Sequence, residues 1–275
     1  MNHLLTIIVT GATGAIGNAA VLALRSQGHN VIATSRRPDH QGFYPLDISN
    51  PVSINSFVQS LSSQGIRIDA LLNNAGTLLP SYSTTPQGFE RVTATNYLGT
   101  YLLTRQLLPL FNPGAHIVCT VSLTCHFAHV DRNFFNLSPR DYSQLGTYAN
   151  SKLAVALFAQ ELQRRYPDRL VVNLTDPGIV NSRMLSMHRW FDPLADLFFR
   201  PFTKSPAKGA QPALNALAAN CSLQLFRGRS HSNIPRRWIQ PDLAAWLWLQ
   251  TEQLVIPPIL QPVHIEVIHK TYYNP

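Results

Sequence analysis

Tyr148 and Lys152 are spaced for joint chemistry. They stand four residues apart in the segment YANSK, and an i, i+4 pair shares one face of a helix. A tyrosine hydroxyl has an ordinary pKa of about 10, which makes it a weak proton donor unless a nearby ammonium stabilises the phenolate. The pair therefore predicts proton transfer to or from a substrate oxygen, with Tyr148 as the acid or base and Lys152 supporting it. The competing interpretation is an ordinary exposed helical pair.

A second group of residues is suited to binding phosphate. Gly11, Gly14 and Gly17 stand between the apolar run LLTIIV and the helical pattern AAVLALRSQG. Glycines at this place allow a tight turn and a close approach of the backbone to a pyrophosphate, and the following helix offers its N-terminus to the anion. The spacing predicts a dinucleotide site.

Two arginines follow about twenty residues later, at the end of the next apolar run. Ser35, Arg36 and Arg37 fall where a dinucleotide fold meets the adenosine ribose, and the next acidic residue is Asp39. A 2′-phosphate would repel a carboxylate and attract planar guanidinium groups. We therefore expect NADP rather than NAD, with Arg36 as the main contact and Arg37 as a second contact or a solvated neighbour. The alternative is a solvated loop.

The candidate site residues must be positioned by strands and helices. In the sequence, short apolar runs alternate with segments long enough for helices. Strands are expected near residues 4–10, 31–34, 69–73, 115–121 and 170–175, and helices near 15–27, 50–64, 86–110 and 141–166. This alternation predicts an α/β fold: one Rossmann-type domain over residues 1–256, with a doubly wound parallel sheet and helices on both faces.

Two later segments do not fit the alternation. Residues 181–202 are aromatic and contain methionine, which indicates a lid over an apolar substrate pocket, with an ordinary packed helical excursion as the alternative. The C-terminal tail, residues 257–275, has strand-like alternation and no assigned role.

Bulk composition narrows the classes of partner. The chain has 275 residues, is 45% hydrophobic and carries a formal charge of +8, but its basic residues are scattered, so we expect no nucleic-acid partner. The apolar start is too short for a membrane span and has no secretion signal, which leaves peripheral membrane contact open.

Three cysteines form no disulfide framework, so reduced thiols and a cytoplasmic location are expected. His126 and His129 lack a third ligand at sensible spacing, so no metal is expected.

Longer motifs point to a family. The segments GFERVTATNYLGTYLLT, YANSKLAVALFAQELQRR, DPGIV and KSPAKGAQPAL occur in this order. Over residues 4–255 the chain resembles the short-chain dehydrogenase/reductase family, and within it the retinol-dehydrogenase-like branch. The resemblance implies a catalytic tetrad of Asn96, Ser122, Tyr148 and Lys152. In it, Ser122 would bind the substrate oxygen and Asn96 would anchor a water that links Lys152 to solvent.

The same resemblance implies the cofactor contacts. Asp47 would meet the adenine amino group, Asn74 and Gly76 would border the adenosine ribose, and the backbone of Ile179 would meet the nicotinamide amide. The full set implied for NADP is Gly11, Thr13, Gly14, Ile16, Gly17, Ser35, Arg36, Arg37, Asp47, Ile48, Asn74, Ala75, Gly76, Tyr148, Lys152, Pro177, Gly178, Ile179 and Ser182.

Three positions depart from the family pattern. Ala15 stands where most tyrosine-dependent members have glycine, and Val121 replaces a usual serine, which leaves Ser122 as the catalytic one. Asp176 before Pro177 is unusual, and the sequence offers no reason for it.

The resemblance implies an NADP-dependent oxidoreductase. It would transfer a hydride between the nicotinamide and a small lipophilic alcohol, aldehyde or ketone, as a monomer or homodimer. Two alternatives stay open: a non-catalytic NADP-binding sensor or scaffold, and a sugar-nucleotide epimerase-like enzyme, which the G-x-x-G-x-x-G spacing alone suggests.

Overall fold

The computed structural model describes residues 4–37, 42–180 and 204–255. The expected lid over residues 181–202, the cofactor contact Ser182 and the tail over residues 257–275 lie outside the described residues.

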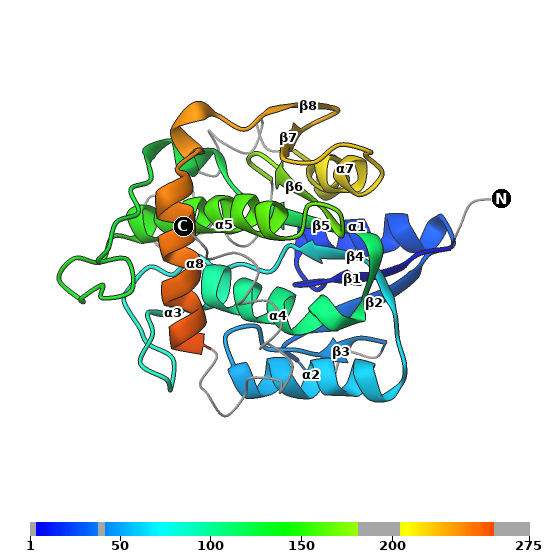
Figure 1. Ribbon diagram of the computed structural model, residues 1–275, viewed down its shortest axis with the longest axis horizontal. Helices are drawn as coiled ribbons and strands as arrows, with labels where there is room; N and C mark the ends of the chain where they lie inside the picture. The colour runs from blue at the N-terminus through cyan, green and yellow to red at the C-terminus, as the bar shows by residue number, and fades with distance from the viewer. Residues whose placement is uncertain (1–3, 38–41, 181–203, 256–275) are drawn as a thin grey trace, which may run out of the picture.

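An eight-stranded sheet forms the centre of the molecule, in the order β3-β2-β1-β4-β5-β6-β7-β8 (Figure 1). Each neighbouring pair from β3 through β7 is parallel, and β8 runs antiparallel to β7. The strands are β1 (Thr6–Val9), β2 (Asn30–Ser35), β3 (Tyr44–Pro45), β4 (Ile68–Asn73), β5 (Phe111–Thr120), β6 (Leu170–Asp176), β7 (Gln224–Arg227) and β8 (Ser230–Asn233).

Helices cover both faces of the sheet, which explains why the strands read as continuous apolar runs. On one face Ile8, Ile32 and Leu71 join a core shared with α2 (Pro51–Ser63), α4 (Gly99–Leu107) and α5 (Gln144–Arg165). On the other face Val9 and Leu72 pack with α1 (Ala15–Ser26) and α7 (Pro206–Leu217). The predicted Rossmann-type fold is confirmed.

The last described helix, α8 (Pro241–Val255), lies across α4 and α5 (Figure 1). Trp248 stacks on Phe158 of α5 with ring centroids 5.8 Å apart, and the hydroxyls of Thr251 and Tyr97 are 2.7 Å apart. The outer face of α5 is therefore buried as well as its sheet-facing side, and this helix carries Tyr148 and Lys152 in a rigid setting.

The prediction of one continuous helix over residues 86–110 was wrong, because this range holds several shorter helical elements. Glu90 caps a short helix, α3 (Arg91–Thr93), by accepting 2.7 Å hydrogen bonds from the N–H groups of Val92 and Thr93. A π-helical turn, η1 (Ala94–Leu98), and α4 then follow. The remaining short elements are the 3-10 turns η2 (Leu108–Leu110), η3 (Leu123–Phe127) and η6 (Arg236–Trp238).

Candidate active site

The proton-transfer pair and Ser122 come together where the parallel strands end. Ser122 follows β5 and begins the turn η3, whose N-terminus it caps through the N–H of Thr124. The Ser122 hydroxyl lies near enough to the Tyr148 phenol to lower its pKa. Lys152 Nζ donates to the carbonyl oxygen of Thr120 at 2.9 Å and lies 5.8 Å from the centre of the Tyr148 ring. Three groups expected from the sequence therefore meet in one place.

The charges of this pair differ from the expectation in one respect. Burial raises the pKa of Tyr148 to about 12, and the hydrogen bond from Ser122 offsets only part of that rise. Burial also lowers the pKa of Lys152 to about 8. The net shift of the tyrosine pKa is therefore upward, because burial of the phenol dominates it, and the stabilisation of the phenolate by the Lys152 ammonium stays a prediction. Tyr148 stands ready as a protonated donor.

Asn96 ties the loop after β4 to α5. Its Oδ1 accepts from the N–H of Thr77 at 2.7 Å, and its Nδ2 donates to the carbonyl oxygen of Thr77 at 3.0 Å and to Ser151 Oγ at 2.9 Å. Asn96 sits in the π-helical turn, a distortion that is frequent at functional sites. A Cβ on Gly76 would lie 3.3 Å from Lys152 Nζ and 3.4 Å from Asn96 Oδ1, so Asn96 also borders the lysine. Its water-anchoring role stays a prediction, and the sequence did not indicate Thr77 or Ser151.

The glycine loop forms a tight cradle at the N-terminus of α1. Gly11 has a φ of +63°, and a Cβ there would lie 2.8 Å from the Cα of Ala75. A Cβ on Gly17 would lie 2.4 Å from the carbonyl oxygen of Gly11. Gly14 is the N-cap of α1, and no side chain caps the helix, which leaves this N-terminus suited to an anion.

The segment after β4 closes against this cradle. Asn74 Nδ2 donates to the carbonyl oxygen of Thr10 at 2.9 Å, and Thr10 Oγ1 accepts from the N–H groups of Asn74 and Ala75 at 3.0 Å. Thr13 is exposed in the loop, while Ala15 and Ile16 open the first turn of α1 and are partly buried. The residues expected around the pyrophosphate therefore adjoin one another, and Ala15 fits as the first helical residue.

The expected adenosine contacts lie at the ends of β2 and β3. Ser35 is buried and its Oγ accepts from the N–H of Arg37 at 3.1 Å, while the side chains of Arg36 and Arg37 are exposed. Asp47 Oδ1 accepts from both the N–H and the hydroxyl of Ser49, and Ile48 is buried beside it. Both arginines are therefore accessible to a charged ligand.

The loop after β6 is held by groups that sequence reasoning did not connect. Gly178 has a φ of +71°, and its N–H donates to Asp176 Oδ1 at 2.9 Å. Asp176 Oδ2 pairs with Arg227 Nε at 3.1 Å, across the two strand ends. Lys204 Nζ reaches the carbonyl oxygen of Pro177 at 3.4 Å. Asp176 therefore has a structural partner, 51 residues away in the chain, which explains why no local motif indicated it.

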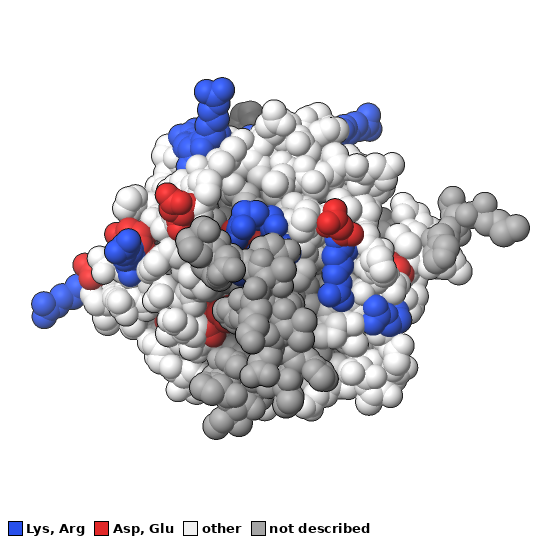
Figure 2. Space-filling view, viewed as in Figure 1, with Lys and Arg blue, Asp and Glu red and all other residues white. Residues whose placement is uncertain are grey.

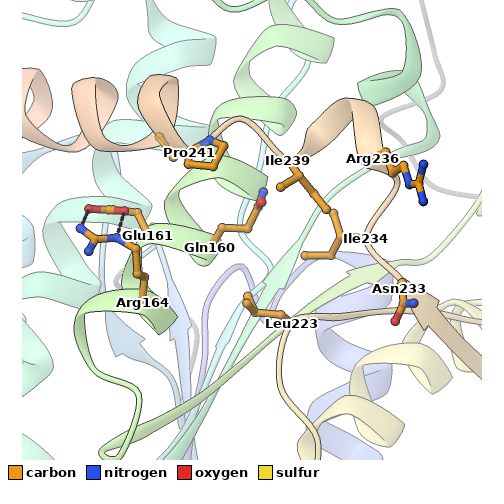
Figure 3. Close-up of a pocket in the computed structure, with 10 residues that line it drawn as sticks. Gln160, Glu161, Arg164, Leu223, Asn233, Ile234, Arg236, Ile239 and Pro241 are labelled. Carbon is orange, nitrogen blue, oxygen red and sulfur yellow. Dashed lines mark hydrogen bonds and ion pairs between the residues drawn. The ribbon is translucent and has the colours of Figure 1, made fainter.

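The clearest groove elsewhere on the described part of the protein is separate from this site. It has a volume of about 540 Å³ and lies between α5, β8, η6 and α8. Figure 3 shows Gln160, Leu223, Ile234 and Ile239 around it. None of the four expected catalytic residues lines it. We therefore do not assign the groove to the reaction.

The family follows from comparison with known proteins. Residues 5–190 match the short chain dehydrogenase family. The chain belongs to this family. A mouse polyprenol dehydrogenase is 34% identical over 239 residues, covering 77% of this chain and 71% of the relative. Human retinol dehydrogenase 13 is 30% identical over 278 residues, covering 91% and 84%. The expected retinol-dehydrogenase-like branch is confirmed, and alcohol–carbonyl oxidoreduction is the chemistry of this short-chain dehydrogenase.

Solved structures agree with the fold. An uncharacterized protein from Mycobacterium paratuberculosis has a TM-score of 0.74 and 26% identity, covering 91% of this chain and 93% of its own. The NADP complex of Pseudomonas aeruginosa RhlG has a TM-score of 0.63 and 22% identity, covering 81% and 93%. A third structure, a 3-alpha-hydroxysteroid dehydrogenase from Pseudomonas sp. B-0831 solved with NADH, has a TM-score of 0.60 and 22% identity, covering 78% and 90%. Two of these structures therefore hold nicotinamide nucleotides, one NADP and the other NADH.

Further features of this short-chain dehydrogenase concern its potential metal ligands, its thiols and its apolar helices. Its described residues contain no cluster of three or more potential metal ligands, and the three cysteines are free thiols. Over residues 4–37, 42–180 and 204–255, no helix is long and apolar enough to cross a bilayer. On the face shown in Figure 2, lysines and arginines stand in several separate places, some of them beside acidic residues, and do not form one continuous patch.

Proposed function

We propose that this chain is an NADP(H)-dependent oxidoreductase that interconverts a lipophilic alcohol with its aldehyde or ketone, with Tyr148 as the general acid and base. The observation that carries the proposal is the position of Lys152 Nζ, 5.8 Å from the centre of the Tyr148 ring, with Ser122 close enough to lower the pKa of the phenol. This group lies at the carboxyl ends of parallel strands, where α/β folds bind their ligands.

Proton transfer follows from the burial of these groups. A carbonyl oxygen bound between Ser122 and Tyr148 would receive a hydrogen bond from each hydroxyl. The raised pKa of Tyr148, about 12, keeps the phenol protonated at neutral pH, as carbonyl reduction requires. Lys152, held by the Thr120 carbonyl, supplies positive charge next to the ring as the phenolate forms. In the oxidative direction the same groups act in reverse.

The described residues fit a dinucleotide. The cradle at Gly11 and Gly17 has no room for a Cβ, and the N-terminus of α1 faces it without a side-chain cap. When bound, the nicotinamide supplies or accepts the hydride. Arg36 and Arg37 are exposed at the end of β2, where guanidinium groups would bind a 2′-phosphate, and this supports NADP over NAD.

Apolar surface beside the tyrosine supports a lipophilic substrate. Leu123 and Phe127 in the turn after Ser122 are 45% and 90% exposed, and Ile179 after Gly178 is 49% exposed. Relatives named for polyprenol and retinol are consistent with such a substrate. All three cysteines are free thiols, and we propose a cytoplasmic location. The working unit that we propose is a monomer or homodimer.

The test is steady-state turnover with a panel of alkyl and isoprenoid aldehydes and ketones. We expect carbonyl-dependent oxidation of NADPH, with NADH much poorer, and loss of turnover in Tyr148→Phe. Cofactor binding without turnover across the whole panel would contradict the proposal and favour the sensor or scaffold alternative.

A further inference from the structure

An ion pair with a buried carboxylate stands next to the catalytic group without a role in the chemistry described above. Asp176 and Arg227 are paired residues at the ends of β6 and β7. The Asp176 side chain is only 3% exposed, and its oxygens accept from Arg227 Nε and from the N–H of Gly178. The Asp176 charge contributes to raising the pKa of both Tyr148 and Lys152, so the pair lies within electrostatic reach of the reacting groups.

The guanidinium of Arg227 has a hydrogen-bond donor that is not used within the described residues. Nε and Nη2 lie along one edge of a guanidinium, and in Arg227 only Nε finds the carboxylate. Nη2 is buried and has no hydrogen-bond partner among the described residues, although 36% of the whole side chain is exposed. A buried N–H donor without an acceptor is unfavourable, so Nη2 is a donor available to an oxygen ligand.

His126 belongs to the same surroundings. It lies in η3, four residues after Ser122, with its ring 5.0 Å from that of Trp238. Its Nδ1 is also buried without a partner among the described residues, and its carbonyl oxygen accepts from Arg237 Nη1 at 3.3 Å. Burial and the positive charges of Arg237 and Arg227 lower the pKa of His126, which keeps the ring neutral at pH 7.

We propose that Arg227, together with His126, forms a subsite for a carboxylate carried by the substrate away from its reacting carbon. Ser122, Asp176 and Arg227 follow the ends of three neighbouring strands, so a substrate bound at Ser122 extends along this edge toward Arg227. The substrate class is then an apolar oxo or hydroxy acid, and this inference rests on the proposed alcohol–carbonyl function.

Charge and chemistry select an anionic group. Arg227 and Arg237 place two cations around His126, while Asp176 is the one acid whose charge contributes to its pKa. A guanidinium N–H can only donate, so its ligand must be an acceptor, and charge-assisted hydrogen bonds to carboxylates are the strong ones. Since Asp176 already has two partners, the second carboxylate would take the free Nη2 rather than displace the first.

The test compares an ω-oxo fatty acid with its methyl ester at equal chain length, with NADPH as reductant. A charged hydrogen bond predicts that the wild-type protein has at least tenfold higher kcat/KM for the acid. Arg227→Gln should abolish that preference, mainly through a higher KM for the acid. Arg229→Gln, which removes an exposed arginine from the same turn, is the matched control and should keep the preference.

Arg227→Gln also leaves the Asp176 carboxylate without its cation. A second variant is therefore needed to separate an effect on folding from an effect on the subsite. The double change Asp176→Asn with Arg227→Gln removes the unpaired charge, and its kcat/KM for the acid should equal its kcat/KM for the ester, whatever its absolute rate with the ester. Equal kcat/KM for acid and ester in the wild-type protein, or a preference that persists in the double variant, would overturn the subsite and leave the proposed function standing. Failure to reduce either compound or any other carbonyl would overturn the proposed function itself.

Discussion

Gly17→Ala should damage the cofactor cradle while leaving the rest of the fold intact. The new Cβ would lie 2.4 Å from the carbonyl oxygen of Gly11 and 2.8 Å from Asn74 Nδ2, both closer than Cβ contacts in proteins. Overpacking of this kind costs about 1–3 kcal/mol, and a weakened Asn74–Thr10 hydrogen bond adds about 1 kcal/mol. The loop relieves the clash by moving from its binding position, so about 2–4 kcal/mol is lost from NADPH binding, or roughly 30- to 900-fold in Kd.

The assay is fluorescence titration of NADPH, paired with thermal unfolding. Gly65→Ala is the control, because Gly65 has open space around it and lies after α2, so that an alanine there meets no neighbour and is strained only by the positive φ of +66°. It should lower stability by about 1 kcal/mol without changing the Kd. A folded Gly17→Ala protein that binds NADPH within threefold of wild type would refute the close-packed cradle.

Three further changes test other parts of the account. Arg36→Asp with Arg37→Ala should weaken NADPH binding by about 2 kcal/mol, at the low end for charged hydrogen bonds because both side chains are exposed, and leave NADH binding nearly unchanged in the same titration. Because burial lowers the pKa of Lys152 to about 8, the rate of carbonyl reduction should fall as pH rises through about 8; Lys152→Met should be slower, bind cofactor more weakly and lack this inflection. Trp248→Ala should cost about 3–5 kcal/mol in urea unfolding, because it empties the contact of α8 with α5; a loss under 1 kcal/mol would contradict that packing.

Local spacing predicted the parts of the site that depend on neighbours in the chain. The glycines of the cradle and the four-residue step from Tyr148 to Lys152 are short-range features, and the structure places them together. The parallel sheet also followed from the alternation of apolar runs and helices, because each buried strand needs two covered faces.

Long-range partners were beyond such reasoning. The pairing of Asp176 with Arg227 depends on β7, a four-residue strand that carries too little pattern to be recognised. The raised pKa of Tyr148 depends on burial by elements far apart in sequence. Sequence spacing predicts which groups meet, but the balance between charge and desolvation needs the packed structure.

The central claim is that Tyr148 transfers the proton, and Tyr148→Phe tests it most directly. The change removes the hydroxyl that meets Ser122 and keeps the ring beside Lys152. Single-turnover reduction of a carbonyl substrate should slow by about two to four orders of magnitude, as for loss of a general acid, while the Kd for NADPH stays within a few-fold of wild type. A variant that binds NADPH normally and keeps more than a tenth of the wild-type rate would contradict the assignment.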